Sequence, residues 1–140
     1  MLAVSDIRIG IVVSRLCKTS QLRGAYGALM QMGCSESNIR LKYVPRDNNL
    51  ALGTSFFAEY TEVDGVVVVA CDRTEALAEA LEHLQIRWNM PVAMYSSESD
   101  AEGLCDLIDM IQLQAEMADS APVDANGALP PRSPRGNDIS

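Results

Sequence analysis

The stretch 63–83, VDGVVVVACDRTEALAEALEH, decides the fold. Its four valines at 66–69 form an unbroken β-branched run with no polar alternation, which is typical of a strand buried on both faces. Strands of this kind occur in parallel sheets that are covered by helices. Asp72, followed by Glu75, forms a capping-box pattern, so we expect a helix to begin directly after the strand. In open α/β sheets ligands bind beyond the carboxyl ends of the strands, so this junction is where we expect a site.

Three further strand-and-helix pairs flank this stretch. Apolar runs and alternation predict strands at 6–13, 39–44 and 92–95, the second of them at the edge of the sheet. Apolar residues at helical spacing predict helices at 19–32, with Thr19 or Ser20 as its N-cap, at 50–60 and at 101–117. Four such units in sequence imply right-handed crossovers. The predicted fold class is therefore α/β, a single flavodoxin-like three-layer domain with a four-stranded parallel sheet.

The composition changes abruptly after Met117. The segment 118–140 holds four prolines, two glycines and almost no large apolar residues. A segment of this composition cannot bury enough apolar surface to form a packed structure. We therefore expect an α/β domain at 1–117 and a disordered Pro/Gly-rich tail at 118–140.

The acidic balance of the chain narrows the choice of partners. The formal net charge is −8, which argues against nucleic-acid phosphates and anionic membranes as partners. No apolar stretch approaches the roughly twenty residues of a membrane-spanning helix. The N-terminal apolar run is interrupted by Gly10 and has no cleavage site for secretion. We expect a cytoplasmic protein.

Four cysteines, Cys17, Cys34, Cys71 and Cys105, are scattered along the chain without a paired motif. We interpret them as reduced thiols in or near the core, because free cysteine prefers burial and the chain shows no secretion signal. A zinc site would need closely spaced ligands and more histidine than His83 alone, so no metal site is predicted.

The candidate ligand-binding residues are polar side chains that follow the first three predicted strands. In chain order they are Arg15, Arg46, Asn48, Asp72 and Arg73. At the carboxyl edge of the sheet such side chains could bind an anion, a sugar or a flavin-like small molecule. The same residue types also form N-caps, polar turns and exposed surface, and that interpretation stays open beside the first.

Five stretches carry a resemblance to a known family: IGIVVSR at 9–15, LRGA at 22–25, NIRLKYVP at 38–45, YTEVDGVV at 60–67 and MPV at 90–92. In their order and spacing they resemble lumazine synthase, the riboflavin-pathway enzyme that joins a ribitylamino-pyrimidine to a four-carbon phosphate. The resemblance spans about 7–117. It implies a flavodoxin-like subunit that forms pentamers, and in many members shells of twelve pentamers, with sites between neighbouring subunits.

The positions of the family's working motifs hold other residues here. Where the family carries Arg-Phe-Asn, whose ring stacks on the pyrimidine, the chain reads RLC at 15–17. The family's Pro-Gly-Ala-Phe-Glu, which binds the ribityl chain, is replaced by PRDNN at 45–49. A longer loop that ends in Gly-x-Thr-x-His, with the proton-transferring histidine, is replaced by CDRT at 71–74, and His83 falls inside the following helix. No Lys or Arg occurs at 99–117 to hold a phosphate.

The resemblance therefore implies a degenerate homologue with no catalytic residues and no cofactor. Such a chain keeps the core of the family, so we expect a non-catalytic protein with an assembly role, a homo-oligomer in the form of a pentamer or shell. Two alternatives stay open. The chain could be a divergent 6,7-dimethyl-8-ribityllumazine synthase, alone or completed by a paralogous subunit, or it could be a flavin- or lumazine-binding module.

Overall fold

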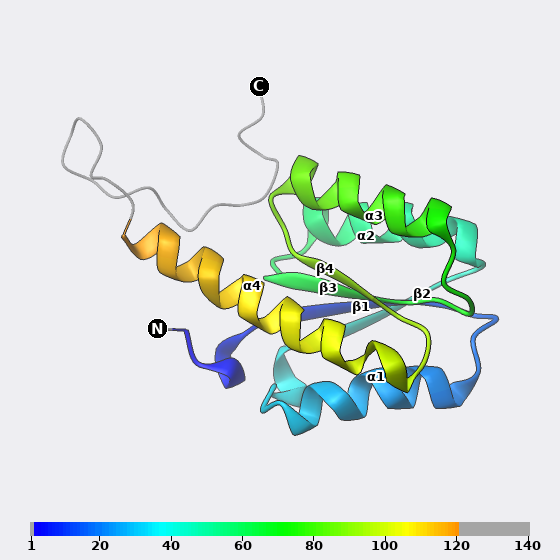
Figure 1. The fold of residues 1–140 in the computed structure, drawn as a ribbon, viewed down its shortest axis with the longest axis horizontal. Helices are drawn as coiled ribbons and strands as arrows, with labels where there is room; N and C mark the ends of the chain where they lie inside the picture. Colours follow the sequence, from blue (N-terminus) through cyan, green and yellow to red (C-terminus); the bar gives the residue numbers. More distant parts are fainter. Residues whose placement is uncertain (1, 121–140) are drawn as a thin grey trace.

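The four strands form one parallel sheet in the computed structural model, which describes residues 2–120 (Figure 1). The strands are β1 (Ile9–Ser14), β2 (Ile39–Val44), β3 (Gly65–Val69) and β4 (Val92–Tyr95), in the order β2-β1-β3-β4. Ile9 pairs with Ile39 on one side and with Gly65 on the other, so β1 is central and β2 lies at the edge. The predicted parallel sheet and its edge strand are confirmed. Of the tail predicted at 118–140, Ala118 and Asp119 belong to α4, and the part after Ser120 lies outside the described residues.

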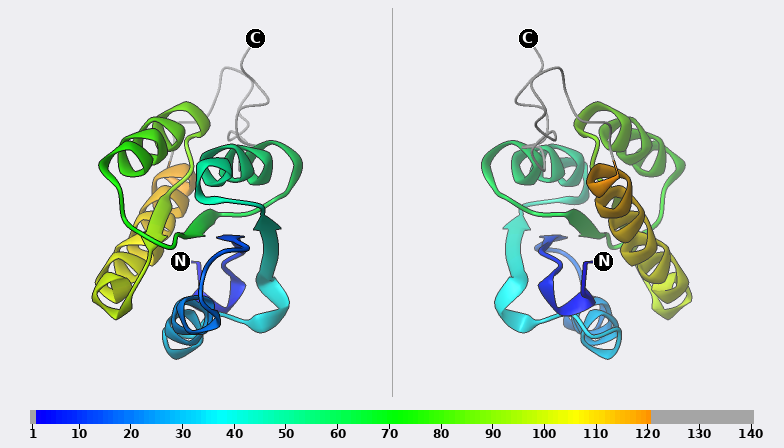
Figure 2. Two further views of the ribbon diagram at one scale, coloured as in Figure 1. Left: turned by 90° about the vertical axis from the view of Figure 1, so that its right-hand side faces the viewer. Right: turned by 90° about the vertical axis from the view of Figure 1, so that its left-hand side faces the viewer.

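Helices cover both faces of the sheet. The helices α1 (Thr19–Gln31) and α4 (Ala101–Asp119) lie on one face, and α2 (Leu50–Tyr60) and α3 (Glu75–Trp88) lie on the other (Figure 2). Along the chain, α1 therefore packs on one face, α2 and α3 pack on the opposite face, and α4 packs again on the first face. The three-layer α/β architecture is therefore as predicted, and α4 continues two residues past the predicted end of its helix. None of the described helices is long and apolar enough to cross a membrane.

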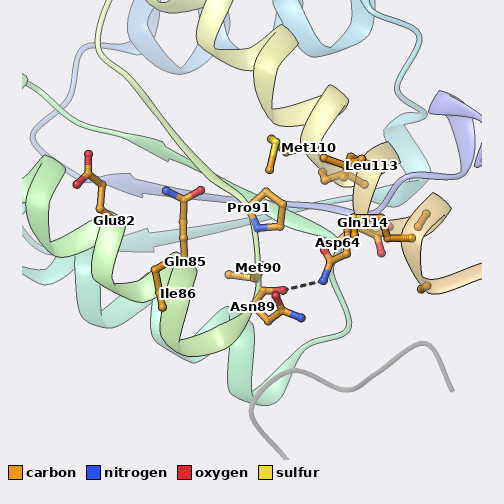
Figure 3. A pocket seen from close by; sticks show the side chains of 14 residues that line it. Asp64, Glu82, Gln85, Ile86, Asn89, Met90, Pro91, Met110, Leu113 and Gln114 are labelled. Atoms are coloured by element: carbon orange, nitrogen blue, oxygen red, sulfur yellow. Dashed lines mark hydrogen bonds between the residues drawn. The ribbon is translucent and has the colours of Figure 1, made fainter. Parts of the chain in front are cut away.

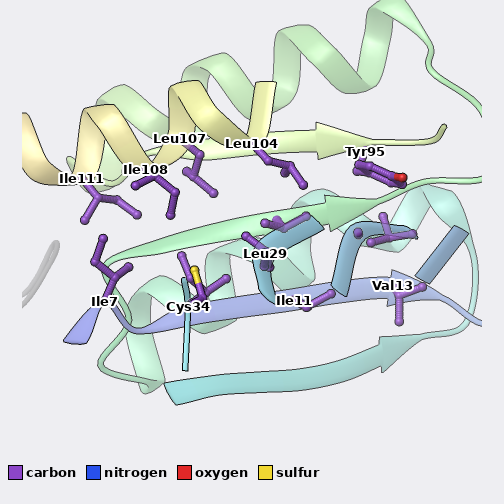
Figure 4. Close-up of a cluster of buried hydrophobic side chains, with 14 residues drawn as sticks. Ile7, Ile11, Val13, Leu29, Cys34, Tyr95, Leu104, Leu107, Ile108 and Ile111 are labelled. Carbon is purple, nitrogen blue, oxygen red and sulfur yellow. The ribbon is translucent and has the colours of Figure 1, made fainter. Parts of the chain in front are cut away.

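Each face of the sheet has its own hydrophobic core. Val67 and Val69 point toward α1 and α4, and Val66 and Val68 point toward α2 and α3. The valine run is thus buried on both faces, as its lack of alternation predicts. The first of these cores, shown in Figure 4, is formed mainly by buried side chains of β1, β3, α1 and α4, together with Ile7 before β1. It includes Ile7, Ile11, Val13, Leu29, Leu104, Leu107, Ile108 and Ile111.

The starts predicted for the first strand and for the helix after β3 are wrong, and so is the N-cap predicted for α1, each for a local reason. The first strand begins at Ile9 rather than residue 6, because Val4–Asp6 closes into a short 3₁₀ helix. Lys18 rather than Thr19 or Ser20 is the N-cap of α1, and the Gln21 side chain accepts a hydrogen bond from its amide at 2.9 Å.

The third error concerns α3, which does not start directly after β3. Its N-cap is Thr74 rather than Asp72, and the Thr74 hydroxyl oxygen accepts a hydrogen bond from the amide of Leu77 at 3.2 Å. Residues 70–74 are consequently free to form a loop at the carboxyl edge of the sheet.

Candidate functional site

Three side chains from three different loops meet at the carboxyl edge of the sheet. Cys17 follows β1, Asp47 follows β2 and Cys71 follows β3. The two Sγ atoms are 3.3 Å apart, and the sulfurs and a carboxylate oxygen of Asp47 all lie within 4.8 Å of one another. All three residues are half-buried, so the cluster is partly open to solvent.

The strand order explains why these loops converge. Because β1 lies between β2 and β3, the loops that leave the three strands are neighbours at one edge. The chain leaves β1 toward α1 on one face and leaves β3 toward α3 on the other. This divergence is a topological switch point, where open α/β sheets form a crevice for ligands.

Hydrogen bonds hold the loops in this arrangement. The Cys71 amide donates to the Asp47 carboxylate at 3.2 Å, and the Arg15 amide donates to the Val44 carbonyl at 2.8 Å. The side-chain amide of Gln21, on α1, donates to the carbonyls of Cys71 at 3.1 Å and Ser96 at 2.9 Å. Gln21 therefore ties the loops after β3 and β4 to the first helix, a role that its sequence position did not reveal.

The environment of Cys17 disfavours a free thiolate. Burial raises the pKa of the Cys17 thiol to about 12, and the neighbouring Cys71 and Asp47 add to the rise. At neutral pH Cys17 therefore carries its proton, and its Sγ lies 3.5 Å from the carbonyl oxygen of Val69. A protonated, hydrogen-bonded thiol is a poor nucleophile, so the cluster is not arranged for attack by Cys17.

A second polar cluster closes the loop between β4 and α4. Asp100 accepts hydrogen bonds from the Ser96 amide at 2.7 Å and the Ser97 amide at 3.2 Å, and it pairs with Arg73. Burial acts to raise the pKa of Asp100, but the hydrogen bonds from Ser96, Arg73 and Ser97 outweigh it, so that the pKa is lowered. Arg73 also donates to the Met94 carbonyl at 3.3 Å. Through these contacts Arg73 and Asp100 connect the loop after β3 to the loop between β4 and α4.

The predicted site residues surround the cysteine cluster rather than forming it. Arg15, Arg46, Asn48 and Asp72 are exposed, and each lies one or two residues from Cys17, Asp47 or Cys71. Arg73 is turned toward Asp100 instead. The predicted location at the strand ends is where side chains converge, but the residues that meet there are two thiols and a carboxylate.

The thiols were missed because Cys17 and Cys71 lie 54 positions apart in the sequence. Their shared signal is that each follows the end of a strand by two or three residues, on strands that the topology places side by side. The expectation of thiols in or near the core describes Cys34, which is buried, but Cys105 is exposed on α4.

Another hollow lies at the opposite, amino end of the sheet. It is a groove of about 790 Å³ between α3 and α4, and Figure 3 shows Gln85, Ile86, Met110 and Leu113 along it. The Gln114 side chain donates to the Asn89 carbonyl at 2.8 Å across its base. Asp64 and Glu82 are the acidic residues of its lining, and Asp64 is paired with Arg8. Because three side chains of metal-ligating type meet at the carboxyl edge, that edge is the better candidate site.

The fold and the crevice at the carboxyl ends of the strands together define the class of the protein. It is a flavodoxin-like parallel α/β domain with its candidate site at that edge. No protein-family model matches the chain. Two curated proteins do, and both are named 6,7-dimethyl-8-ribityllumazine synthase. The protein from Porphyromonas gingivalis is 33% identical over 69 residues, 47% of this chain and 43% of the relative. The protein from Parabacteroides distasonis is 37% identical over 70 residues, 48% of this chain and 44% of the relative.

These matches confirm a resemblance to lumazine synthases over about half of this chain. The matched stretch spans less than half the length of either relative.

Proposed function

We propose that the protein is a non-catalytic, lumazine-synthase-like subunit whose role is to assemble into a homo-oligomer. The observation that carries this proposal is an apolar stripe on the outer face of α2. Leu52, Phe56 and Tyr60 follow one another at a spacing of four residues and are 57%, 50% and 75% exposed. The rings of Phe56 and Tyr60 pack against each other, with centroids 6.1 Å apart.

Such a stripe is costly on an isolated subunit. Contiguous exposed apolar surface commonly marks a protein–protein interface, and aromatic side chains are the usual anchors of such interfaces. The opposite side of the same helix already packs on the subunit's own sheet, where a Cβ on Gly53 would lie 2.9 Å from Val12 and Val44. The small size of Gly53 is therefore needed for packing inside the subunit, and the exposed stripe is the part of α2 that remains for a partner.

The edge strand β2 presents a second exposed apolar surface. Leu41 and Tyr43 are exposed on the face opposite to α2, because side chains alternate along a strand and Val44 packs toward α2. An edge strand also presents backbone amides and carbonyls that a partner strand can pair. A second copy of the chain could therefore contact both α2 and β2.

The site supports the non-catalytic part of the proposal. Condensation of the two lumazine precursors needs a stacking platform, a proton shuttle and a phosphate clamp in one place. At the position of the stacking ring the chain carries Leu16, which is 61% exposed. His83 lies on an exposed face of α3, eight residues or about 12 Å along the helix from its start at the carboxyl edge.

Light scattering on the purified chain tests the assembly. We expect a native mass several times the 15.2 kDa of one chain. Phe56→Asp and Tyr60→Asp should each lower the mass toward that of a monomer, because a buried, unpaired carboxylate at an interface is strongly unfavourable. Ile86→Asp is the matched control, since Ile86 is 85% exposed on α3 and lies outside the stripe. A monomeric wild-type protein would refute the proposal, and dissociation by Ile86→Asp alone would move the interface to α3.

Two further measurements separate the alternatives. A turnover assay with the ribitylamino-pyrimidine and the four-carbon phosphate should show no lumazine formation, and activity would establish a divergent synthase. Titration with riboflavin or ribityllumazine should leave the fluorescence of the ligand unchanged. Quenching by the oligomer, lost together with assembly in Phe56→Asp, would instead indicate a flavin- or lumazine-binding module with sites between subunits.

A further inference from the structure

We infer that Cys17, Asp47 and Cys71 form a binding site for a thiophilic divalent cation of the zinc class. The site would be held by one ligand from each of the loops after β1, β2 and β3. This inference is independent of the proposed assembly role, because it concerns the carboxyl edge of the sheet rather than the outer face of α2.

The spacing of the three ligand atoms suits such a cation. Two thiolates bound at about 2.3 Å to a tetrahedral zinc ion lie roughly 3.8 Å apart. The two sulfurs are 3.3 Å apart in the protein, so each would need to move by only a few tenths of an ångström. The Asp47 oxygen, within 4.8 Å of both sulfurs, can approach the same centre from the loop after β2.

The donor types also point to this class of metal. Thiolates select zinc and other soft or borderline metals, and a carboxylate completes many zinc sites, whereas magnesium and calcium prefer oxygen ligands alone. Three protein ligands leave the fourth tetrahedral position to water. The half-buried state of all three residues provides solvent access to that position.

The surroundings orient the ligands, as the outer partners of metal sites do. The Cys71 amide donates to the Asp47 carboxylate at 3.2 Å, which holds the oxygen beside the sulfurs. The side-chain amide of Gln21 donates to the carbonyls of Ala70 at 3.3 Å and Cys71 at 3.1 Å, which fixes the backbone that carries the second thiol. A bound cation would displace the thiol protons, and its charge would then offset the mutual repulsion of the two thiolates and the carboxylate.

Cobalt titration of the full-length chain tests the site. The protein is reduced, stripped of metal and titrated with Co²⁺ without oxygen. We expect one cobalt ion per chain, a sulfur-to-cobalt charge-transfer band and the intense visible bands of tetrahedral cobalt, all removed by added Zn²⁺. Cys17→Ser and Cys71→Ser should each weaken binding by about tenfold or more, since even the loss of an outer partner costs that much. Asp47→Asn should weaken binding but keep the charge-transfer band, because both sulfurs remain.

Matched variants and competing outcomes make the test decisive. Cys105→Ser, His83→Ala and Asp72→Asn remove an exposed thiol, the only imidazole and a neighbouring carboxylate, and each should bind cobalt as the wild type does. Circular dichroism of the metal-free variants verifies their fold. The inference is overturned if the reduced wild type gives no charge-transfer band, or if the band survives in both Cys17→Ser and Cys71→Ser. A Cys17–Cys71 disulfide on exposure to air, with no cobalt bound after reduction, would identify a redox pair instead.

Discussion

At the scale of single residues, Gly10 lets the ring of Phe57 lie directly on the central strand. A Cβ at this position would be 2.8 Å from Phe57 Cδ1, and Phe57 is itself buried in the second core. We predict that Gly10→Ala lowers the free energy of unfolding by about 1–3 kcal/mol, because the added methyl group would overlap a buried ring. Urea denaturation measures the difference.

Gly27 is the matched control for Gly10. It lies in α1, and nothing is within 4 Å of a Cβ added there. Gly27→Ala should therefore raise the free energy of unfolding by about 0.5–1 kcal/mol, because it removes backbone freedom from the unfolded chain without strain. Equal stabilities for Gly10→Ala and the wild type would contradict the packing of Phe57 on β1.

Asp100 makes the stability depend on pH through its lowered pKa. A carboxylate whose pKa is lower in the folded than in the unfolded chain stabilises the fold above the unfolded pKa, and this contribution is lost as the pH falls through the folded value. We predict that Asp100→Asn costs about 1–3 kcal/mol at pH 7, where hydrogen bonds to the charged carboxylate are present in the wild type. Below the ordinary value of 3.8 the cost should shrink toward zero.

Denaturation of both proteins at pH 7 and at pH 3 measures this dependence. Asp106→Asn, which replaces an exposed carboxylate on α4, is the control and should behave like the wild type at both pH values. A cost of Asp100→Asn that stays constant across this range would show that the Ser96 and Arg73 contacts do not depend on the charge of Asp100.

At the scale of elements, the start of α3 distinguishes two capping residues. Thr74 accepts the hydrogen bond from Leu77, and Asp72 is exposed in the loop before it. We predict that Thr74→Ala lowers the free energy of unfolding by about 1 kcal/mol. Asp72→Ala should change it by less than about 0.5 kcal/mol, as expected for a surface substitution. A larger loss of stability in Asp72→Ala would instead support the capping box of Asp72 and Glu75 that the sequence pattern predicts.

The same helix shows which parts of an element a sequence predicts. The body of α3 follows from the spacing of Leu77, Leu81, Leu84 and Trp88, because burial of one face is set by the helical period. The start of α3 does not follow from this spacing. Both Asp72 and Thr74 are good N-cap residues, and the choice between them depends on the path of the loop after β3. That loop is held by Cys71 and Asp47, a contact across 24 positions that no local pattern contains.

At the scale of the whole molecule, the candidate site depends on topology in the same way. The order β2-β1-β3-β4 brings together the loops after β1 and β3, and with them two cysteines that look unrelated along the chain. The strand ends could be predicted as the place of a site from the α/β pattern alone. The chemistry of the site could not, because it is created by the juxtaposition of residues from three separate units.

Assembly should also govern the thermal stability of the molecule. If the chain forms an oligomer through α2, unfolding separates the subunits, and the melting temperature then rises with protein concentration by mass action. For a pentamer, a hundredfold increase in concentration should add roughly 2 kcal/mol per chain, enough to raise the melting temperature by several degrees. Phe56→Asp should abolish this dependence while leaving the helical signal intact, whereas Ile86→Asp should retain it. Scanning calorimetry over that concentration range decides the matter, since a wild-type melting temperature that does not change with concentration would mean that folding and assembly are not coupled.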